Sequence, residues 1–319
     1  MDINGDFEIS GTTSFTDGTI SLTGDVPQTV HIIASAAVTV ELNNLRIENS
    51  SAGDVTFLER TFRLNGVMRP LQGNIVIDPI TTFIIASNSA TEGGRIAPII
   101  APTNFTGEFV VERFIPAGVA DWRNLCSPVI GATFDDWDPD LAMSGEGFPD
   151  GCAFGPDGCF RSVTYTDHSI FYEVINSSDP ITNGRGFEIF VGSDLETFDG
   201  TTLRTPGTLN TTADVVESFT TGWTIFGNPY ASPITFATLA RSGGVQNYFY
   251  VYDPASGAYE WYDGASGTSS LPEITSSGLM ATGQAVWIFA TSAGDTTINQ
   301  FNTPSADATY IRTSHPCHP

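Results

Sequence analysis

The chain has 319 residues, of which only 15% are charged, and a formal net charge of −24. Soluble proteins usually contain about 25% charged residues, so the negative charge reflects missing bases more than an excess of acids. All 12 basic residues are arginine, and there is no lysine. This composition excludes Schiff-base lysines and P-loops. It also argues against nucleic acid and anionic membrane surfaces as partners, because phosphate binding requires clustered basic side chains.

The composition also predicts an all-β protein. Its 32 glycines and 19 prolines, together with the absence of a long helical period, are typical of short strands joined by many turns. No apolar run is long enough to cross a bilayer, and no signal peptide follows Met1, so we expect no membrane insertion and a fragment or a mature chain. A chain of this length can form two or three domains, and one large all-β domain is the alternative. We place them at residues 1–105, 106–215 and 216–319.

In residues 1–105, apolar and small polar residues alternate, as in strands with one buried face. Asn43-Asn44 and Asn65-Gly66 are placed at turns, because Asn and Gly tolerate positive φ. The spacing fits the rungs of a parallel β-solenoid, whose core is buried only by stacking, and a sandwich-like stack is the alternative. The expected strands span residues 7–9, 19–22, 29–33, 38–42, 45–47, 62–64, 75–77 and 83–85.

Residues 106–215 are expected to form a β-rich module with a long, irregular, acidic insertion at residues 127–160. Cys152 and Cys159 flank a turn-rich segment of this insertion that can bring them together, and we predict that they form a disulfide. A disulfide is typical of an extracellular protein. Two reduced thiols are the alternative.

The acidic insertion also contains a candidate calcium site. Asp136, Asp138 and Asp140 alternate along the chain, and Ca²⁺ takes several carboxylate and carbonyl oxygens. The segment lacks the glycine of an EF-hand loop, and Pro139 interrupts it. A solvated acidic loop without a metal is the alternative. Further oxygen ligands would come from Glu146, Asp150 and Asp157.

Residues 216–319 are expected to form a β-sandwich-like module with an aromatic hairpin at residues 248–264. Alternation along the first strand of this hairpin places Tyr248, Tyr250 and Tyr252 on one face, and Phe249 and Val251 on the other. If the tyrosines are exposed, they can bind a glycan by stacking on its sugar rings. Cross-strand aromatic pairs that only stabilise the sheet are the alternative.

The segment 219–236 reads as a strand, a rigid corner and a second strand. Trp223 and Ile225 favour the first strand, in which we expect Trp223 to be largely buried. Pro229 has no N–H to donate and therefore ends the strand, with Tyr230 packed at the corner.

Part of this segment, Gly222-Trp-x-x-x-Gly-Asn-Pro-Tyr-x-Ser-Pro-Ile, resembles a recurring motif of large secreted surface proteins of the Bacteroidetes. Two further stretches fit the same family, and one of them is followed by Ser127-Pro128. The resemblance covers residues 94–301 in scattered motifs, and it implies a modular, β-rich cargo of the type IX secretion system. It implies no particular activity. The two stretches are Arg95-Ile-Ala-Pro-Ile and Val111-Glu-Arg-Phe-Ile-Pro-Ala-Gly-x-x-x-Trp-Arg-x-Leu.

No catalytic residues are predicted, because the sequence lacks Gly-x-Ser-x-Gly, His-Glu-x-x-His and glycine-rich phosphate loops. His315, Cys317 and His318 are metal-ligand types, but they lie in a tail that we expect to be disordered. No cofactor is expected apart from the candidate Ca²⁺.

We therefore expect a non-enzymatic structural or adhesive module at the cell surface or outside the cell. Its expected partners are other copies of itself, neighbouring modules and surface glycans, and copies could assemble into a filament or a surface layer. A carbohydrate-binding module is the first alternative. A fragment of a surface polysaccharide hydrolase is the second, because any two of the 36 acidic residues could meet in space.

Overall fold

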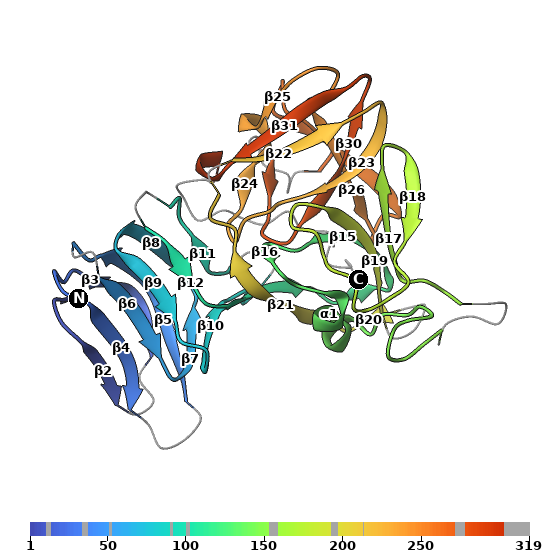
Figure 1. The fold of residues 1–319 in the computed structure, drawn as a ribbon. Helices are drawn as coiled ribbons and strands as arrows, with labels where there is room; N and C mark the ends of the chain where they lie inside the picture. The colour runs from blue at the N-terminus through green and yellow to red at the C-terminus, as the bar shows by residue number, and fades with distance from the viewer. Residues whose placement is uncertain are drawn as a thin grey trace.

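The computed structural model describes residues 1–10, 14–33, 38–50, 53–89, 92–99, 103–152, 159–192, 197–212, 214–271 and 278–302. Among the described residues, 57% are in strands and 5% in helices, so the all-β prediction is confirmed. A stack of parallel strands lies at the N-terminal end, and two β-rich modules follow it (Figure 1).

The N-terminal section is a β-solenoid, because every pair of strands within it is parallel. Parallel pairing between rungs decides between the two alternatives that the sequence left open. The first sheet contains β1 (Asp2–Ile3), β3 (Phe15–Leu22), β5 (Thr39–Glu48), β7 (Arg60–Leu64), β8 (Val67–Gln72), β10 (Thr81–Ile85), β11 (Arg95–Ile96) and β13 (Phe109–Ile115). The second contains β2 (Phe7–Ser10), β4 (Gln28–Ile33), β6 (Asp54–Leu58), β9 (Asn74–Ile77) and β12 (Phe105–Thr106).

The turn predicted at Asn43-Asn44 is wrong, because β5 runs through both residues. The first part of β5 pairs with β7 and the second part with β8, so the two asparagines lie where the strand passes from one partner to the next. Asn65-Gly66 does lie between two strands, as predicted. Gly66 is needed there, because a Cβ would lie 2.5 Å from the Asn43 carbonyl oxygen.

Aromatic side chains in register form the centre of the solenoid core. Phe62 pairs with Phe83, and Phe83 with Phe109, so one ring follows another from rung to rung. Their centroids are 6.1 and 5.4 Å apart, and all three residues are fully buried. Burial of a phenylalanine side chain contributes about 1.5–3 kcal/mol, so this stack is a major stabilising feature of the solenoid.

Strand β13 belongs to both the solenoid and the next module. One edge pairs in parallel with β10, and the other pairs antiparallel with β21 (Thr201–Leu209). β16 (Val129–Ile130) also pairs with β21. The sheet therefore continues from the solenoid into the middle module without a break in hydrogen bonding.

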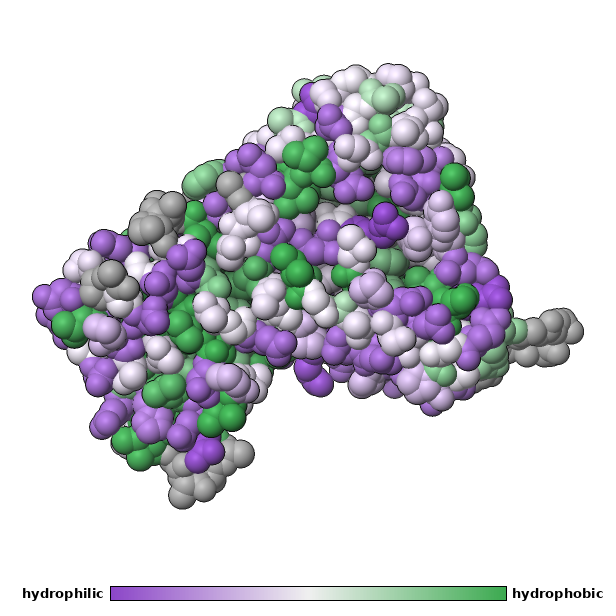
Figure 2. Space-filling model, in the orientation of Figure 1, coloured by the Kyte–Doolittle hydropathy of each residue, from purple (hydrophilic) through white to green (hydrophobic). Residues whose placement is uncertain are grey.

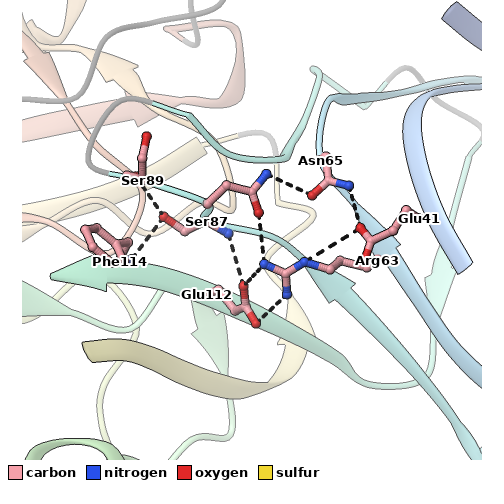
Figure 3. Close-up of polar contacts among 8 residues, drawn as sticks. Glu41, Arg63, Asn65, Ser87, Ser89, Glu112 and Phe114 are labelled. Carbon is pink, nitrogen blue, oxygen red and sulfur yellow. Dashed lines mark hydrogen bonds and ion pairs between the residues drawn. The ribbon is translucent and has the colours of Figure 1, made fainter. Parts of the chain in front are cut away.

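A polar network fixes this junction (Figure 3). The Arg63 guanidinium donates to one Glu112 carboxylate oxygen at 2.7 Å and lies 2.7 Å from the other. It also donates to Asn88 Oδ1 at 3.0 Å, and Asn88 donates to Asn65 Oδ1 at 2.9 Å. The backbone N–H of Ser87 donates to Glu112 at 3.1 Å. Because Arg63 is on β7 and Glu112 on β13, the network ties two rungs together past the end of β10.

The middle module contains one four-stranded sheet and one helix. The sheet order is β15 (Asp121–Cys126), β19 (Gly186–Val191), β17 (Val163–Asp167) and β18 (Ile170–Glu173). Strands β14 (Gly118–Val119) and β20 (Thr197–Phe198) form a separate pair.

The predicted irregular insertion is partly wrong, because α1 (Phe134–Leu141) forms within it. Phe134, Trp137 and Leu141 bury one side of this helix. The carboxylate of Asp136 accepts the Thr133 backbone N–H at 2.8 Å and so satisfies a donor at the start of the helix.

The C-terminal module is sandwich-like. A five-stranded sheet contains β23 (Gly222–Gly227), β30 (Ala285–Ala290), β26 (Tyr248–Asp253), β27 (Ala258–Asp263) and β28 (Thr268–Ser269). A three-stranded sheet contains β22 (Asp214–Phe219), β31 (Gly294–Asn299) and β25 (Ala240–Arg241). Between them lies a core that includes Phe226, Phe249, Ile288 and Ile298. The smaller elements are β24 (Ile234–Thr235), η1 (Phe236–Thr238), β29 (Leu279–Met280) and η2 (Gln300–Asn302).

Among the described residues, no helix has the length and apolar character that a membrane span requires.

Candidate functional site

One face of the five-stranded sheet is covered with aromatic side chains. Side chains alternate across a strand, so Phe249 and Val251 of β26 point into the core while Tyr250 points to the opposite face. Tyr250 lies opposite Trp287 of β30 and Trp261 of β27. The pairing of neighbouring strands therefore gathers aromatic residues from distant parts of the chain on one surface.

Four of these aromatic residues line a groove of about 520 Å³. Thr166 and Ser169 also line it, and they belong to the β17–β18 hairpin, which lies beside β23 and β26 (Figure 1). The groove is thus bounded by the middle and C-terminal modules. The aromatic residues are Trp223, Tyr250, Tyr259 and Trp287.

The aromatic rings stand nearly at right angles to one another. Trp223 meets Tyr250 at 76° and Trp287 at 80°, with centroids 5.3 and 6.5 Å away. Tyr259 meets Trp287 at 83°, with the centroids 6.4 Å apart. Edge-to-face contacts of this kind hold the rings in fixed orientations. The result is a set of separate walls rather than one flat platform.

The prediction that Trp223 is largely buried is wrong, because 38% of this residue is exposed. Its strand neighbours Thr224 and Phe226 are buried, so the local pattern correctly indicated a strand with a buried face. The pattern could not show that the other face of this strand borders a groove. Tyr259 is more exposed still, at 51%.

The β17–β18 turn is held directly against β23. His168 and Ser169 have φ values of 52° and 63°, as in the two-residue hairpin turn with positive φ at both positions. The Ser169 N–H donates to the Trp223 carbonyl at 2.7 Å, and the Trp223 N–H donates to Ser169 Oγ at 2.8 Å. Gly222 permits this approach, because a Cβ there would lie 2.5 Å from Ser169 Oγ.

Glu188 of β19 lies beside two of the aromatic side chains of the groove. The Tyr259 hydroxyl donates to a Glu188 carboxylate oxygen at 3.4 Å. Burial raises the pKa of Glu188, and contacts with Tyr259 and Trp287 oppose that rise. Among the described residues, no arginine or histidine forms an ion pair with Glu188.

The Gly-Asn-Pro-Tyr motif contacts the middle module through the Pro229 carbonyl, which accepts from the Asn183 side-chain amide at 3.0 Å. Asn228 is fully buried, and its side-chain amide donates to the carbonyls of Ser232 at 2.8 Å and Ala281 at 3.1 Å. Its Oδ1 accepts the Tyr230 N–H at 3.0 Å. Tyr230 is 4% exposed, so it packs at this corner as predicted. The motif thus has a structural role.

Cys126, at the end of β15, is buried where the middle module packs against the C-terminal module. Its thiol donates to the Gln284 carbonyl at 3.1 Å, and burial raises the pKa of Cys126 to about 12. Gly227 lies against it, because a Cβ at residue 227 would be 2.3 Å from the Cys126 Cβ. The two walls of the groove therefore have little freedom to move apart at this point.

The three tyrosines that were predicted to bind a ligand lie at three different places. Tyr250 lines the groove. Tyr252 donates its hydroxyl to Asp121 of the middle module at 2.8 Å and so belongs to the module interface. Tyr248 is 38% exposed and hydrogen-bonds to Asp263, which raises its pKa. Sequence reasoning missed Trp223, Tyr259 and Trp287 as groove residues, and Glu188 beside them, because their proximity depends on strand pairing and module packing.

The structure does not bring the three candidate calcium ligands together. Asp136 accepts from Thr133, and Asp138 accepts the Met143 N–H at 2.9 Å. Burial raises the pKa of Asp138. Asp140 pairs with Arg204 of β21, whose guanidinium nitrogen lies 3.3 Å away. Residues two positions apart on a helix point in different directions, so each of the three carboxylates contacts a different partner.

The predicted cysteine pair is joined in the structure, with an S–S distance of 2.11 Å between Cys152 and Cys159. In the described part of the chain, these cysteines and Glu146 are the only group of three residues with metal-ligand atoms close together. Disulfide sulfurs are not thiolate ligands, and Glu146 pairs with Arg161. Asp157, His315, Cys317 and His318 lie outside the described residues.

Comparisons of the chain with protein-family models, with curated proteins and with solved structures found no match. The groove is therefore interpreted from its own chemistry.

Proposed function

We propose that this chain is a non-enzymatic adhesive module, located outside the cell or at its surface, that binds carbohydrate in the aromatic groove. The observation that carries the proposal is the groove itself, in which two tryptophans and two tyrosines line about 520 Å³ between two packed modules. Binding sites are typically concave and apolar with a few polar groups, and this groove has that composition.

The chemistry of the lining suits a sugar. A pyranose ring presents C–H groups on one face, which pack against an aromatic ring, and hydroxyls at its rim. Thr166 and Ser169 also line the groove, and their hydroxyls can exchange hydrogen bonds with those of the sugar. Because the rings stand at right angles, each one offers a separate surface for a single sugar unit.

The groove favours binding over hydrolysis. Glycoside hydrolysis uses two carboxyl groups about 5–10 Å apart on either side of the scissile bond. None of the described residues that line the groove is an Asp or a Glu. Glu188 is a single carboxylate at the Tyr259 hydroxyl and is not one of the lining residues, and the nearby carboxylate of Asp167 is 3.6 Å from the Arg185 guanidinium. The hydrolase alternative therefore lacks a pair of carboxylates facing one ligand.

Titration calorimetry with neutral oligosaccharides tests the proposal on matched variants. Trp223→Ala removes a wall of the groove and should weaken binding about tenfold or more, as expected for a buried aromatic anchor. Trp261→Ala is the control, because Trp261 is 37% exposed against 38% for Trp223 but does not line the groove. Equal affinities for the two variants, or no binding of any glycan by the unmodified chain, would contradict the proposal.

A second candidate function, self-association, is favoured by the open edges of the solenoid. β1 and β2 are the outermost strands of their sheets, and no other described strand pairs with their outer edges. Unpaired N–H and C=O groups on such an edge can bind another strand. On the face drawn in Figure 2, hydrophobic residues are scattered among hydrophilic ones, so strand edges are the better contact surface there. The expected partner is another copy or a neighbouring module.

A further inference from the structure

We infer that the groove selects glycans that carry a protonated amine, and that Glu188 is the residue that determines this selectivity. The inference rests on the proposed function and names its ligand class. Its starting point is a half-buried carboxylate within 3.4 Å of the Tyr259 hydroxyl, beside two side chains that line the groove.

Two arginines lie on or next to the strands around Glu188: Arg185 directly precedes β19, and Arg123 is on β15, which pairs with β19. Both make other contacts. Arg185 packs its guanidinium 4.8 Å from the centre of the Tyr165 ring and lies near Asp167. Arg123 donates to the carbonyls of Val119 at 2.9 Å and Trp122 at 3.2 Å. Neither forms an ion pair with Glu188 in the described part of the chain. Among the described residues, the carboxylate thus has no cation paired with it, and it has lost part of its hydration through burial.

A ligand ammonium group supplies the missing charge. A cation beside a desolvated carboxylate replaces the water that burial removed. The groove rings add to this attraction, because the faces of tryptophan and tyrosine are negative and attract cations within about 6 Å. With the rings at 76–83° to one another, a cation next to one ring edge faces a neighbouring ring. Both contributions favour an amine and disfavour a uronate or a sulfate.

The sugar ring is required as well as the amine. The cavity of about 520 Å³ is large for an isolated ammonium group, and most of its lining is aromatic rather than acidic. The ligand class is therefore an amino sugar with a free, protonated amine, in which the ring packs on the aromatic walls and the amine approaches Glu188.

Calorimetry with a glucosamine tetramer, its N-acetylated counterpart and a neutral glucose tetramer tests this inference. We expect the amine-bearing tetramer to bind at least tenfold more tightly than the other two at low salt. Added salt should reduce this preference without weakening the neutral ligand, because only the ion pair is screened. Ethanolamine, an amine without a sugar ring, should bind far more weakly than the tetramer.

Glu188→Gln should remove the preference for the amine and leave the affinity for the neutral tetramer unchanged. Glu260→Gln is the control and should keep the preference. Glu260 follows Tyr259 on β27 and therefore points to the opposite face of the sheet. Thermal melting confirms that each variant is folded, and the salt series on the unmodified chain tests the inference if Glu188→Gln does not fold.

The outcomes separate the two proposals. Equal binding of the three tetramers would overturn the inference and leave the proposed function standing. Tighter binding of a uronic acid oligomer would do the same. An equal loss of all ligands in a folded Glu188→Gln variant would show that Glu188 is only structural and would overturn the inference. No glycan binding at all would overturn both.

Discussion

At the scale of single residues, Gly227 leaves no room for a side chain where it faces Cys126 across the module junction. An alanine here would place its Cβ 2.3 Å from the Cys126 Cβ and 2.7 Å from its Sγ. Overpacking of a buried site typically costs about 1–3 kcal/mol, so Gly227→Ala should lower the free energy of unfolding by that amount or more. Urea unfolding followed by tryptophan fluorescence measures the loss.

Gly118 provides the matched control for this substitution. A Cβ at Gly118 meets no atom within 4 Å, so Gly118→Ala should leave the unfolding midpoint nearly unchanged. Equal unfolding midpoints for the two alanine variants would contradict the prediction, because they would show that the residues around Gly227 accommodate a Cβ at little cost.

The burial of Cys126 gives a second prediction, on pH. Only the thiolate form of cysteine reacts with alkylating reagents, and burial raises the pKa of Cys126 to about 12. At pH 9 the native chain should therefore leave Cys126 unmodified by iodoacetamide, whereas the chain in denaturant should be modified at this residue. Peptide mass spectrometry assigns the label to Cys126. Labelling of native Cys126 at the denatured rate would contradict its burial.

The sign of the effect on stability follows from the same shift. The unfolded thiol ionises near pH 9, whereas the folded thiol stays neutral until about pH 12. Ionisation therefore favours the unfolded chain between these values, and the contribution of Cys126 to stability falls as the pH rises through this window.

The sequence could predict disulfide pairing and strand faces where these depend only on residues close together in the chain. Cys152 and Cys159 are close along the chain, and the alternation of residues 248–252 assigns the two faces of that strand. Glu188 and Trp287 are 99 positions apart, and only the pairing of their separate sheets brings them to one groove. The helix over residues 134–141 was missed because its buried residues are few and Pro139 lies within it.

At the scale of elements, the Arg63–Glu112 pair is expected to couple β7 to β13. Glu112 has a side chain that is only 5% exposed, so Arg63→Met would leave a buried carboxylate without its cation. The loss should be about 2–3 kcal/mol, below the 3–5 kcal/mol of a fully buried pair, because Arg63 itself is 21% exposed. Chemical denaturation measures it.

The double variant Arg63→Met/Glu112→Leu completes the thermodynamic cycle. It removes both charges, so it should be more stable than Arg63→Met alone. A double variant whose loss equals the sum of the two single losses would show that the two residues act independently.

In the solenoid, the alternation of apolar and polar residues predicts where strands lie but not which strands pair. The expected segments at residues 62–64, 75–77 and 83–85 all lie within β7, β9 and β10, because alternation is a property of adjacent residues. Which strand pairs with which is decided by stacking over a longer distance. The change of partner along β5 at Asn43-Asn44 follows from this, since the first part of the strand pairs with β7 and the second part with β8.

At the scale of the whole molecule, the net charge of −24 opposes contact between copies. Association through the edges of β1 and β2 depends on backbone hydrogen bonds, which salt screens little, whereas the repulsion between copies is screened within about 10 Å at 0.1 M salt. Self-association should therefore strengthen as the salt concentration rises. Sedimentation velocity across a salt series measures it. A compact monomer at every salt and protein concentration would leave adhesion to a different partner as the proposed function.

The sharing of β13 between solenoid and middle module has a mechanical consequence. A pulling force applied at the groove reaches the solenoid through the two ladders of β13, one antiparallel to β21 and one parallel to β10. Seven residue pairs join β13 to β21 and three join it to β10, so under tension along the strands the β10 side should shear first. The bidentate contact of Arg63 with Glu112 spans that weaker side and shares its load. We expect the solenoid and the middle module to respond to such a force as one continuous sheet until the β10 side separates.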